Sequence, residues 1–385
     1  MTLLSEASFL VTPNGYKASK LYAAIPTNGN GDMTFTRATT ATRVDENNLV
    51  SSVASNVPRI DYTGGGCPSI LLEPQRTNQS LNSNDISQIG TLNSPSSVIN
   101  TSGNYAESPD GTENATRVVA SATGFNYALI SSTAITSTSG DYVGSIYLKS
   151  NNGSNQNVAF YGRNASVNYV TITPNWERYN VLGSASSNFI NFGARTSYGS
   201  DSSLDFLAWG LQIEHGSYAT SLIPTVASTV TRNADVINRD DIYTNNLITA
   251  AGGTWFIELN NNIPYTRDNF SYGIFLNTLN NSNGNGFNIT NGIAGYRLII
   301  NKVLNGIYFV SYITLTDVVK IAIKWNGSRA DIFENGVKVI TATPFTSTNM
   351  EFLSGNGSDV PKYIKSQLLF PTPLTDSECQ ALTTL

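Results

Sequence analysis

Residue types that perform chemistry are sparse in this chain, and histidine is the rarest of them. His215 is the single histidine among 385 residues, so a Ser-His-Asp triad or a zinc site built on several histidines would have to centre on it. It stands in a Glu214-His215-Gly216 turn, where a general base would be poorly oriented. The sequence therefore favours a solvated turn residue over a catalytic base.

Carboxylates are not arranged for the hydrolysis of glycosidic bonds. Retaining glycosidases hold two carboxyl groups about 5 to 5.5 Å apart, and one strand can supply such a pair when acidic residues alternate along it. The chain has no Glu-x-Asp-x-Glu run, and Glu258 stands alone on its expected strand. Gly64-Gly-Gly66 also lacks the following helix and lysine of a phosphate-binding loop. We therefore expect a protein that is not an enzyme.

Aromatic side chains beside expected turns offer a different chemistry, which is the recognition of sugars by flat apolar platforms with nearby polar groups. The chain has 19 Tyr, 16 Phe and 4 Trp, and most of them must pack in cores. The candidates for ligand binding are those next to loops: Phe125, Tyr127, Tyr161, Tyr265 and Tyr272. For each of them taken singly, packing at the end of a strand is the alternative.

The elements that would position these side chains are short β-strands. Apolar residues alternate with polar ones far more often than they recur at helical spacing, which indicates an all-β chain. Asn335-Gly336 predicts a type I′ hairpin turn, and Thr375 is the expected N-cap of one C-terminal helical turn. The clearest expected strands cover residues 142–149, 158–161, 168–173, 254–259, 296–300, 318–324 and 330–333.

Composition excludes several classes of partner. Charged residues make up 13% of the chain, the net charge is -5 and the pI is near 5.0, so nucleic acid is not an expected partner. No run approaches about 18 consecutive apolar residues, and the N-terminal residues lack the pattern of a signal peptide, so no membrane insertion is expected. Cys67 and Cys379 are expected to be free thiols of a protein made in a reducing cytoplasm.

Loss of apolar patterning suggests two connectors and hence three domains. Residues 78–95 are rich in amides and hydroxyls, and residues 224–252 carry Pro224 and the Gly252-Gly253 pair. The expected domains are an N-terminal module at 1–84, a jelly roll at 85–228 and a further sandwich at 238–385.

The N-terminal region carries a family resemblance. The segments are Phe35-Thr-Arg-Ala-Thr-Thr-Ala-Thr-Arg43-Val-Asp45, Val57-Pro-Arg-Ile-Asp61-Tyr62 and Gly64-Gly-Gly-Cys67-Pro-Ser-Ile-Leu-Leu-Glu73-Pro-Gln-Arg76-Thr-Asn78. They resemble the N-terminal region of bacteriophage virion proteins of the tail-fibre and head-fibre type. We expect the arginines Arg37, Arg43, Arg59 and Arg76 to bind backbone carbonyls or a neighbouring subunit.

Two later stretches carry related resemblances. Residues 205–225, followed by Val230-Thr-Arg232-Asn-Ala-Asp235, are similar to the closing segment of a phage carbohydrate-binding-type jelly roll. His215 departs from it, because a second carboxylate or another polar residue is expected there. Residues 332–339 and 364–378 are similar to concanavalin A-like (laminin G-like) sandwiches.

These resemblances imply a function and several partners. They imply a virion-surface protein whose N-terminal module attaches to other phage virion proteins, and whose sandwiches bind host-cell surface polysaccharide. They also imply a homotrimer. Jelly rolls of this kind often hold a structural Ca2+, for which Asp110 and Asp205 occupy suitable positions. For Asp110, a plain β-turn at Pro109-Asp-Gly111 is the alternative.

Two alternatives remain open at this point. The protein could be a capsid decoration or purely structural virion component without glycan binding. It could also be a polysaccharide depolymerase, which the missing carboxylate pattern and the absence of β-helix repeats disfavour.

Overall fold

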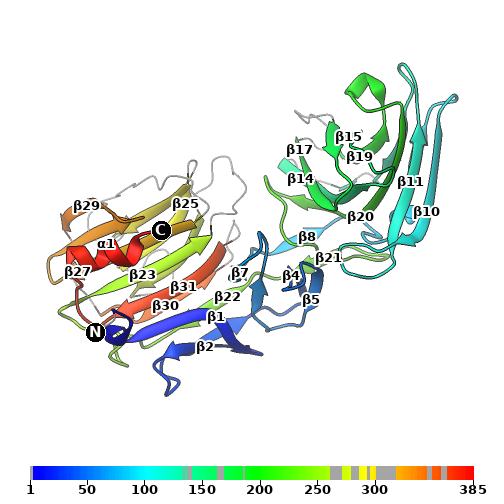
Figure 1. Ribbon diagram of the computed structural model, residues 1–385. Helices are drawn as coiled ribbons and strands as arrows, with labels where there is room; N and C mark the ends of the chain where they lie inside the picture. The colour runs from blue at the N-terminus through cyan, green and yellow to red at the C-terminus, as the bar shows by residue number, and fades with distance from the viewer. Residues whose placement is uncertain are drawn as a thin grey trace. The chain divides into compact units, whose positions relative to one another are not determined.

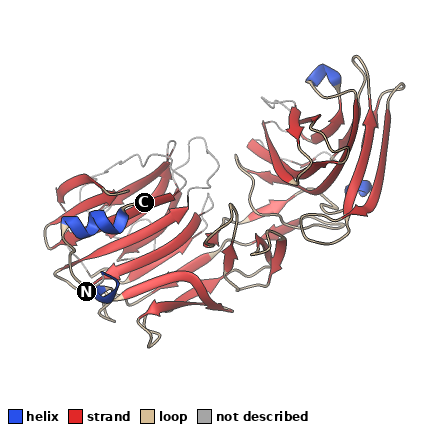
Figure 2. Ribbon diagram, viewed as in Figure 1, coloured by secondary structure: helices blue, strands red, loops and turns tan. Residues whose placement is uncertain are grey.

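The computed structural model in Figure 1 describes residues 3–132, 135–136, 141–162, 169–184, 187–260, 271–278, 286–292, 295–300, 318–344, 349–356 and 362–385. In these residues strands dominate, with three short 3-10 helices and one α-helix (Figure 2). The expected all-β fold class of tandem β-sandwiches is confirmed.

The chain divides into two compact units. Unit 1 comprises Met1–Asn48, Ser52–Gln75 and Asn233–Leu385, whereas unit 2 comprises Leu49–Ser51 and Arg76–Arg232. The elements of unit 1 are η1 (Leu3–Glu6), β1 (Phe9–Lys17), β2 (Lys20–Ile25), β3 (Met33–Thr36), β4 (Ala41–Val44), β6 (Arg59–Asp61), β7 (Ser69–Leu72), β22 (Val236–Arg239), β23 (Gly252–Asn260), β24 (Ser271–Asn277), β25 (Gly286–Gly292), β26 (Gly295–Ile300), β27 (Val318–Asn326), β28 (Arg329–Glu334), β29 (Val337–Pro344), β30 (Phe352–Asn356), β31 (Lys362–Phe370) and α1 (Asp376–Thr383).

The remaining elements belong to unit 2, apart from β5 (Val50–Val53), which has residues of both. They are β8 (Arg76–Asn78), η2 (Ile86–Gln88), β9 (Thr91–Asn93), β10 (Val98–Ala106), β11 (Ala115–Ser121), β12 (Ala128–Ser131), β13 (Ile135–Thr136), β14 (Asp141–Ser150), β15 (Gln156–Gly162), β16 (Tyr169–Ile172), β17 (Glu177–Ser184), β18 (Ser187–Asn188), β19 (Ile190–Ala194), η3 (Thr196–Tyr198), β20 (Ser203–His215) and β21 (Val230–Arg232).

Unit 1 is built around one continuous antiparallel sheet that joins both ends of the sequence. β1 pairs with β31 through Phe9 opposite Leu369, and β31 in turn pairs with β23. β7 also pairs with β31, and β3 pairs with β22. The sequence-based division at residue 84 therefore differs from the observed one, because the first strands of the chain complete the same sheet as the last ones.

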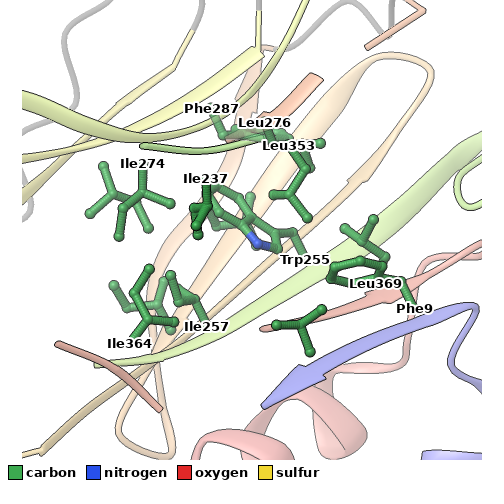
Figure 3. Close-up of a cluster of buried hydrophobic side chains, with 14 of the residues drawn as sticks. Phe9, Ile237, Trp255, Ile257, Ile274, Leu276, Phe287, Leu353, Ile364 and Leu369 are labelled. Carbon is green, nitrogen blue, oxygen red and sulfur yellow. The ribbon is translucent and has the colours of Figure 1, made fainter. Parts of the chain in front are cut away.

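The core of unit 1 is formed by inward-facing residues of these strands. Trp255 of β23 is fully buried, and Figure 3 shows it among apolar side chains from β1, β22, β24, β30 and β31. Its indole Nε1 donates to Oε1 of the buried Gln367 at 3.3 Å, so the polar edge of the ring is satisfied. Alternate residues such as Phe256 face the other side of the sheet. There they pack with Phe333 of β28 and with Cys379 of α1.

Two local predictions are confirmed in unit 1. Thr375 caps α1 with a reciprocal capping box, in which its side chain accepts from the Glu378 amide and the Glu378 carboxylate accepts from the Thr375 amide. Asn335 and Gly336 take φ values of 45° and 83°, as a type I′ turn requires.

Two arginines of the N-terminal motifs, Arg37 and Arg59, form a buried ionic network. Arg37 Nη1 lies 2.9 Å from Asp235 Oδ1, and Arg59 Nη1 lies 2.6 Å from Glu73 Oε2. The second oxygen of Asp235 binds Arg59 Nη2 and the Glu73 amide. Burial by itself would lower the pKa of Arg59, but the charges and hydrogen bonds of Asp235 and Glu73 outweigh it and raise that pKa.

Backbone carbonyls complete this network. Arg37 donates to the carbonyls of Thr39, Ala54 and Val57, and Arg59 donates to that of Thr42. The expected bonding to carbonyls is thus found within the chain for Arg37 and Arg59, and also for Arg43, which donates to the Ile60 carbonyl. Arg76 donates to the Tyr218 hydroxyl.

Unit 2 is a sandwich of two five-stranded antiparallel sheets. Their strand orders are β10-β11-β20-β14-β17 and β16-β15-β19-β12-β9, and one hydrophobic core lies between them. The expected jelly-roll range 85–228 lies inside this unit. Glu214, next to His215, is buried and accepts hydrogen bonds from Gln212 Nε2 at 2.7 Å and from the Thr220 amide at 2.9 Å, so this carboxylate has a structural partner set.

Candidate functional site: an arginine within a group of aromatic side chains

The outer face of one sheet of unit 2 carries an aromatic and amide row. Phe160 of β15 faces Phe192 of β19 across the ladder, and both side chains belong to the core. The next pair in register is Tyr161 with Asn191, so these two side chains share the opposite face. Strand alternation thus places a tyrosine and an amide side by side, directed away from the core.

A second, smaller hydrophobic cluster forms on this face. Tyr161 packs against Tyr198 with ring centroids 4.7 Å apart, and against Phe189 at 6.4 Å, both in edge-on geometry. Tyr127 is packed against the same cluster. We call Tyr127, Tyr161, Phe189 and Tyr198 the aromatic cluster.

Arg195 lies at the centre of the aromatic cluster. It directly precedes the short helix η3, and its Nη1 donates to the Tyr161 hydroxyl at 2.7 Å. Its guanidinium carbon stands 3.8 Å from the Tyr198 ring centroid, 5.5 Å from that of Tyr161 and 5.7 Å from that of Tyr127. Cation–π attraction of this kind holds the planar group against the rings.

A turn beside Arg195 displays Phe125. The side chain of Phe125 is 93% exposed, although it is a large apolar ring. Gly124 takes a positive φ of 63°, and its carbonyl accepts a hydrogen bond from the Thr196 hydroxyl of η3 at 2.6 Å. The Tyr127 amide donates to Ser94 Oγ at 2.9 Å. The turn is therefore fastened on both sides of Phe125, and its exposed ring has no packing role.

The structure brings together three of the sequence-predicted ligand residues, and the other two have side chains outside the described residues. Tyr127 and Tyr161 meet at Arg195, and Phe125 is on the adjoining turn. Tyr272 lies on β24 of unit 1 and its side chain is outside the described residues, as is the whole of Tyr265. Their role in ligand binding stays a prediction.

The two residues predicted for calcium accept hydrogen bonds from other side chains of the protein. Asp205 accepts from Arg117 Nε at 2.8 Å and Nη2 at 2.6 Å, and these hydrogen bonds lower its pKa. Burial tends to raise the pKa of Asp110, but hydrogen bonds from Thr112 and Ser108 outweigh it and lower that pKa.

The two carboxylates do not share a metal site that the structure shows. No group of three or more His, Cys, Asp or Glu that could hold a metal ion occurs in the described part of the chain. A calcium ion at Asp110 or Asp205 stays a prediction.

The sequence reasoning missed Arg195, Asn191, Phe189 and Tyr198. No spacing pattern in the sequence predicts them, because the residues of the aromatic cluster come from separate segments, around residues 127, 161 and 189–198. The one local signal is an arginine and a tyrosine three residues apart, followed by Gly199, directly after a strand. A turn of that composition at a strand end could have been added to the candidate platforms.

Comparisons with known proteins give fold-level likeness alone. No family model and no curated protein matches the chain. A solved receptor binding domain is 14% identical with a TM-score of 0.31, and the match covers 39% of each chain. The Ruminococcus gnavus IT-sialidase CBM40 bound to alpha2,3 sialyllactose is 12% identical with a TM-score of 0.28, covering 35% of this chain and 83% of that one.

A third similar structure is the CBM22-1 xylan-binding domain of Paenibacillus barcinonensis Xyn10C. It is 14% identical with a TM-score of 0.27, and the match covers 37% of this chain and 94% of that one. Because all three TM-scores are low, no functional conclusion rests on these likenesses. Within the described residues, no helix is long and apolar enough to span a membrane.

Proposed function

We propose that this protein is a non-enzymatic bacteriophage virion protein of the tail- or head-fibre type, which binds host-surface glycans through the aromatic cluster of unit 2. The observation that carries the proposal is the exposed Phe125 ring fastened beside Arg195 and its tyrosines. The virion part of the proposal is supported by the motif resemblance of residues 35–78.

Sugar chemistry fits this arrangement. A pyranose ring has an apolar C–H face that packs on an aromatic ring, and hydroxyl groups that need donors and acceptors at its edge. Phe125 offers the exposed ring, and Arg195 and Asn191 offer a donor and an acceptor. Each site would bind weakly, and a homotrimeric fibre would gain avidity from several sites.

Binding to host cells tests the proposal directly. The full-length protein, fluorescently labelled, is titrated onto host cells and onto a glycan array, beside the variants Phe125→Ala and Tyr105→Ala. Tyr105 is the matched control because it is also exposed, at 43%, but lies on β10 of the other sheet.

The proposal expects saturable binding by the wild type and by Tyr105→Ala. Phe125→Ala should bind about three- to tenfold more weakly per site, which corresponds to the loss of one aromatic packing contact. Absence of saturable binding to every cell and glycan tested would overturn the proposal in favour of a capsid decoration or structural component.

A further inference from the structure

We propose that the glycan bound at the aromatic cluster is an acidic saccharide whose carboxylate pairs with Arg195. This inference deepens the proposed function and rests on it. It assigns a substrate class, carboxylated sugars such as uronic acids, to a site that would otherwise accept any pyranose.

The first observation is that the positive charge of Arg195 has no counter-ion in the described residues. Its Nη1 is taken by the Tyr161 hydroxyl, and in the described part of the chain neither Nη2 nor Nε has a hydrogen-bond acceptor or a carboxylate partner. A guanidinium is always protonated and offers five donors in a planar fork that matches a carboxylate. The cation is held among apolar rings, where screening by water is weaker than in bulk.

Two other arginines of unit 2 have the carboxylate or the second acceptor that Arg195 lacks, although the Nε of Arg178, like that of Arg195, has no partner in the described residues. Arg117 lies 5.0 Å over the Tyr105 ring, as Arg195 lies over tyrosines, but Arg117 binds the Asp205 carboxylate through two nitrogens. Arg178 donates from Nη1 to the Thr220 carbonyl at 2.6 Å and from Nη2 to Ser145 Oγ at 2.9 Å. Arg195 has neither a counter-ion nor a second acceptor within the described residues.

The second, independent observation is an amide on the same sheet face. Asn191 is 6% exposed, and its Oδ1 has no hydrogen-bond partner in the residues that the structure describes. A buried amide oxygen without a donor costs about 1 to 3 kcal/mol, and a ligand that brings a hydroxyl donor would recover part of that cost. Asn191 stands directly across the ladder from Tyr161, which binds Arg195.

These two observations together select a carboxylated sugar over a simple anion. An inorganic sulfate or phosphate ion would satisfy Arg195, but it has no apolar face for Phe125. A neutral sugar would use Phe125 and Asn191, but it would leave the guanidinium without a counter-ion. A sugar carboxylate supplies the planar anion, the hydroxyl donor and the apolar ring face in one molecule.

The experiment compares each acidic glycan with its own neutral form. An array carries oligosaccharides of uronic acids and other carboxylated sugars, each beside its carboxyl-reduced counterpart, together with neutral, sulfated and phosphorylated oligosaccharides. The full-length protein is measured as wild type, Arg195→Gln, Arg195→Lys and the matched control Arg117→Gln. The readout is the affinity ratio between acidic and carboxyl-reduced partners.

The inference expects a ratio of about 10 to 100 in the wild type, the range of a charge-assisted hydrogen-bonded pair. Arg195→Gln should bring the ratio to near one, Arg195→Lys should keep an intermediate value, and Arg117→Gln should leave it unchanged. Added salt should weaken binding of the acidic form selectively. A merely structural role for Arg195 would weaken both forms equally and leave the ratio unchanged.

Each other outcome is decisive. Equal binding of acidic and reduced forms by the wild type overturns the inference and leaves glycan binding standing, as does a preference that survives in Arg195→Gln. Binding to sulfated or phosphorylated oligosaccharides alone replaces the carboxylate by a tetrahedral anion and also overturns it. Binding to no glycan overturns the proposed function itself. If Arg195→Gln fails to fold by circular dichroism, the wild-type ratio and its value in Arg195→Lys decide.

Discussion

Two buried arginines of unit 1 and one arginine of unit 2 that lies among aromatic rings differ in their hydrogen-bond and ionic partners. In unit 1, Arg37 and Arg59 share the carboxylate of Asp235, and backbone carbonyls accept further hydrogen bonds from both. In unit 2, Arg195 is surrounded by tyrosines, and in the described residues no carboxylate pairs with it. The difference separates arginines whose partners lie within the fold from one that our proposal assigns to a ligand.

The largest expected effect comes from breaking the network of unit 1. Asp235→Asn removes the negative charge that two fully buried guanidinium groups share, and it should lower the free energy of unfolding by about 3 to 5 kcal/mol. Guanidinium chloride titration followed by tryptophan fluorescence measures the loss. Asp240→Asn, at an exposed aspartate, is the matched control and should change the free energy by less than about 0.5 kcal/mol. A loss below about 1 kcal/mol for Asp235→Asn would show that the network is not a stabilising centre.

Replacing arginine by lysine should have a smaller effect on the free energy of unfolding, and the effect should differ between Arg37 and Arg195. Arg37→Lys keeps the charge but cannot reach three carbonyls and Asp235 at once, so about 2 kcal/mol of unfolding free energy should be lost. Arg195→Lys gives up one hydrogen bond to Tyr161 and should cost about 1 kcal/mol or less. Thermal and chemical unfolding of the two variants in parallel measures both. Equal losses would contradict the contrast between the two sites.

Asp61 in unit 1 and Asp205 in unit 2 have pKa shifts of opposite direction, so their contributions to stability should change with pH in opposite directions. Burial raises the pKa of Asp61, so the folded state holds that proton more tightly than the unfolded state, and stability falls as the pH rises from the usual value of 3.8 through the raised one. Asp61→Asn should remove this slope.

Asp205 supplies the opposite sign. Hydrogen bonds from Arg117 lower its pKa, so its stabilising contribution is present above 3.8 and is lost as the pH falls through the lowered value. Asp205→Asn should therefore destabilise unit 2 at neutral pH and reduce its sensitivity to acid. Unfolding free energies of both variants measured at several acid and neutral pH values check the signs, and slopes of the same sign would contradict the assignment.

The smallest expected effect on stability is at Phe125. Because its ring is 93% exposed, Phe125→Ala should change the free energy of unfolding by less than about 0.5 kcal/mol. A large loss in the same unfolding assay would mean that the ring packs against the protein in solution, which would remove it from the candidate site.

The sequence predicted local structure well and long-range pairing poorly. Alternation of apolar residues located strands such as β14 and β23, and turn chemistry located the Asn335-Gly336 hairpin and the Thr375 cap. The pairing of Phe9 with Leu369 has no local signal, because it depends on the sum of many weak side-chain contacts between strands far apart in the chain. The expected N-terminal module accordingly shares its sheet with the C-terminal sandwich.

The candidate site could be predicted only in part, because it too depends on contacts between segments far apart in the chain. Tyr127 and Tyr161 were recognisable as aromatics at strand ends, and Phe125 as an aromatic beside a glycine. Arg195 could not be predicted as a ligand-binding residue, since that assignment depends on the absence of a carboxylate around it in the described part of the fold. Composition counts charges, but it cannot show which of them are paired.

The discontinuity of unit 1 has a consequence for how the protein is made. The strand β1 leaves the ribosome long before its partner β31 is synthesised. Most of unit 2 lies in one stretch, Arg76–Arg232, and we expect it to fold during translation while β1 and β7 still lack β31. A recombinant fragment that starts after residue 95 would leave β31 without β1 and β7, so a host strain rich in chaperones and the intact chain are the suitable starting material for the binding experiments.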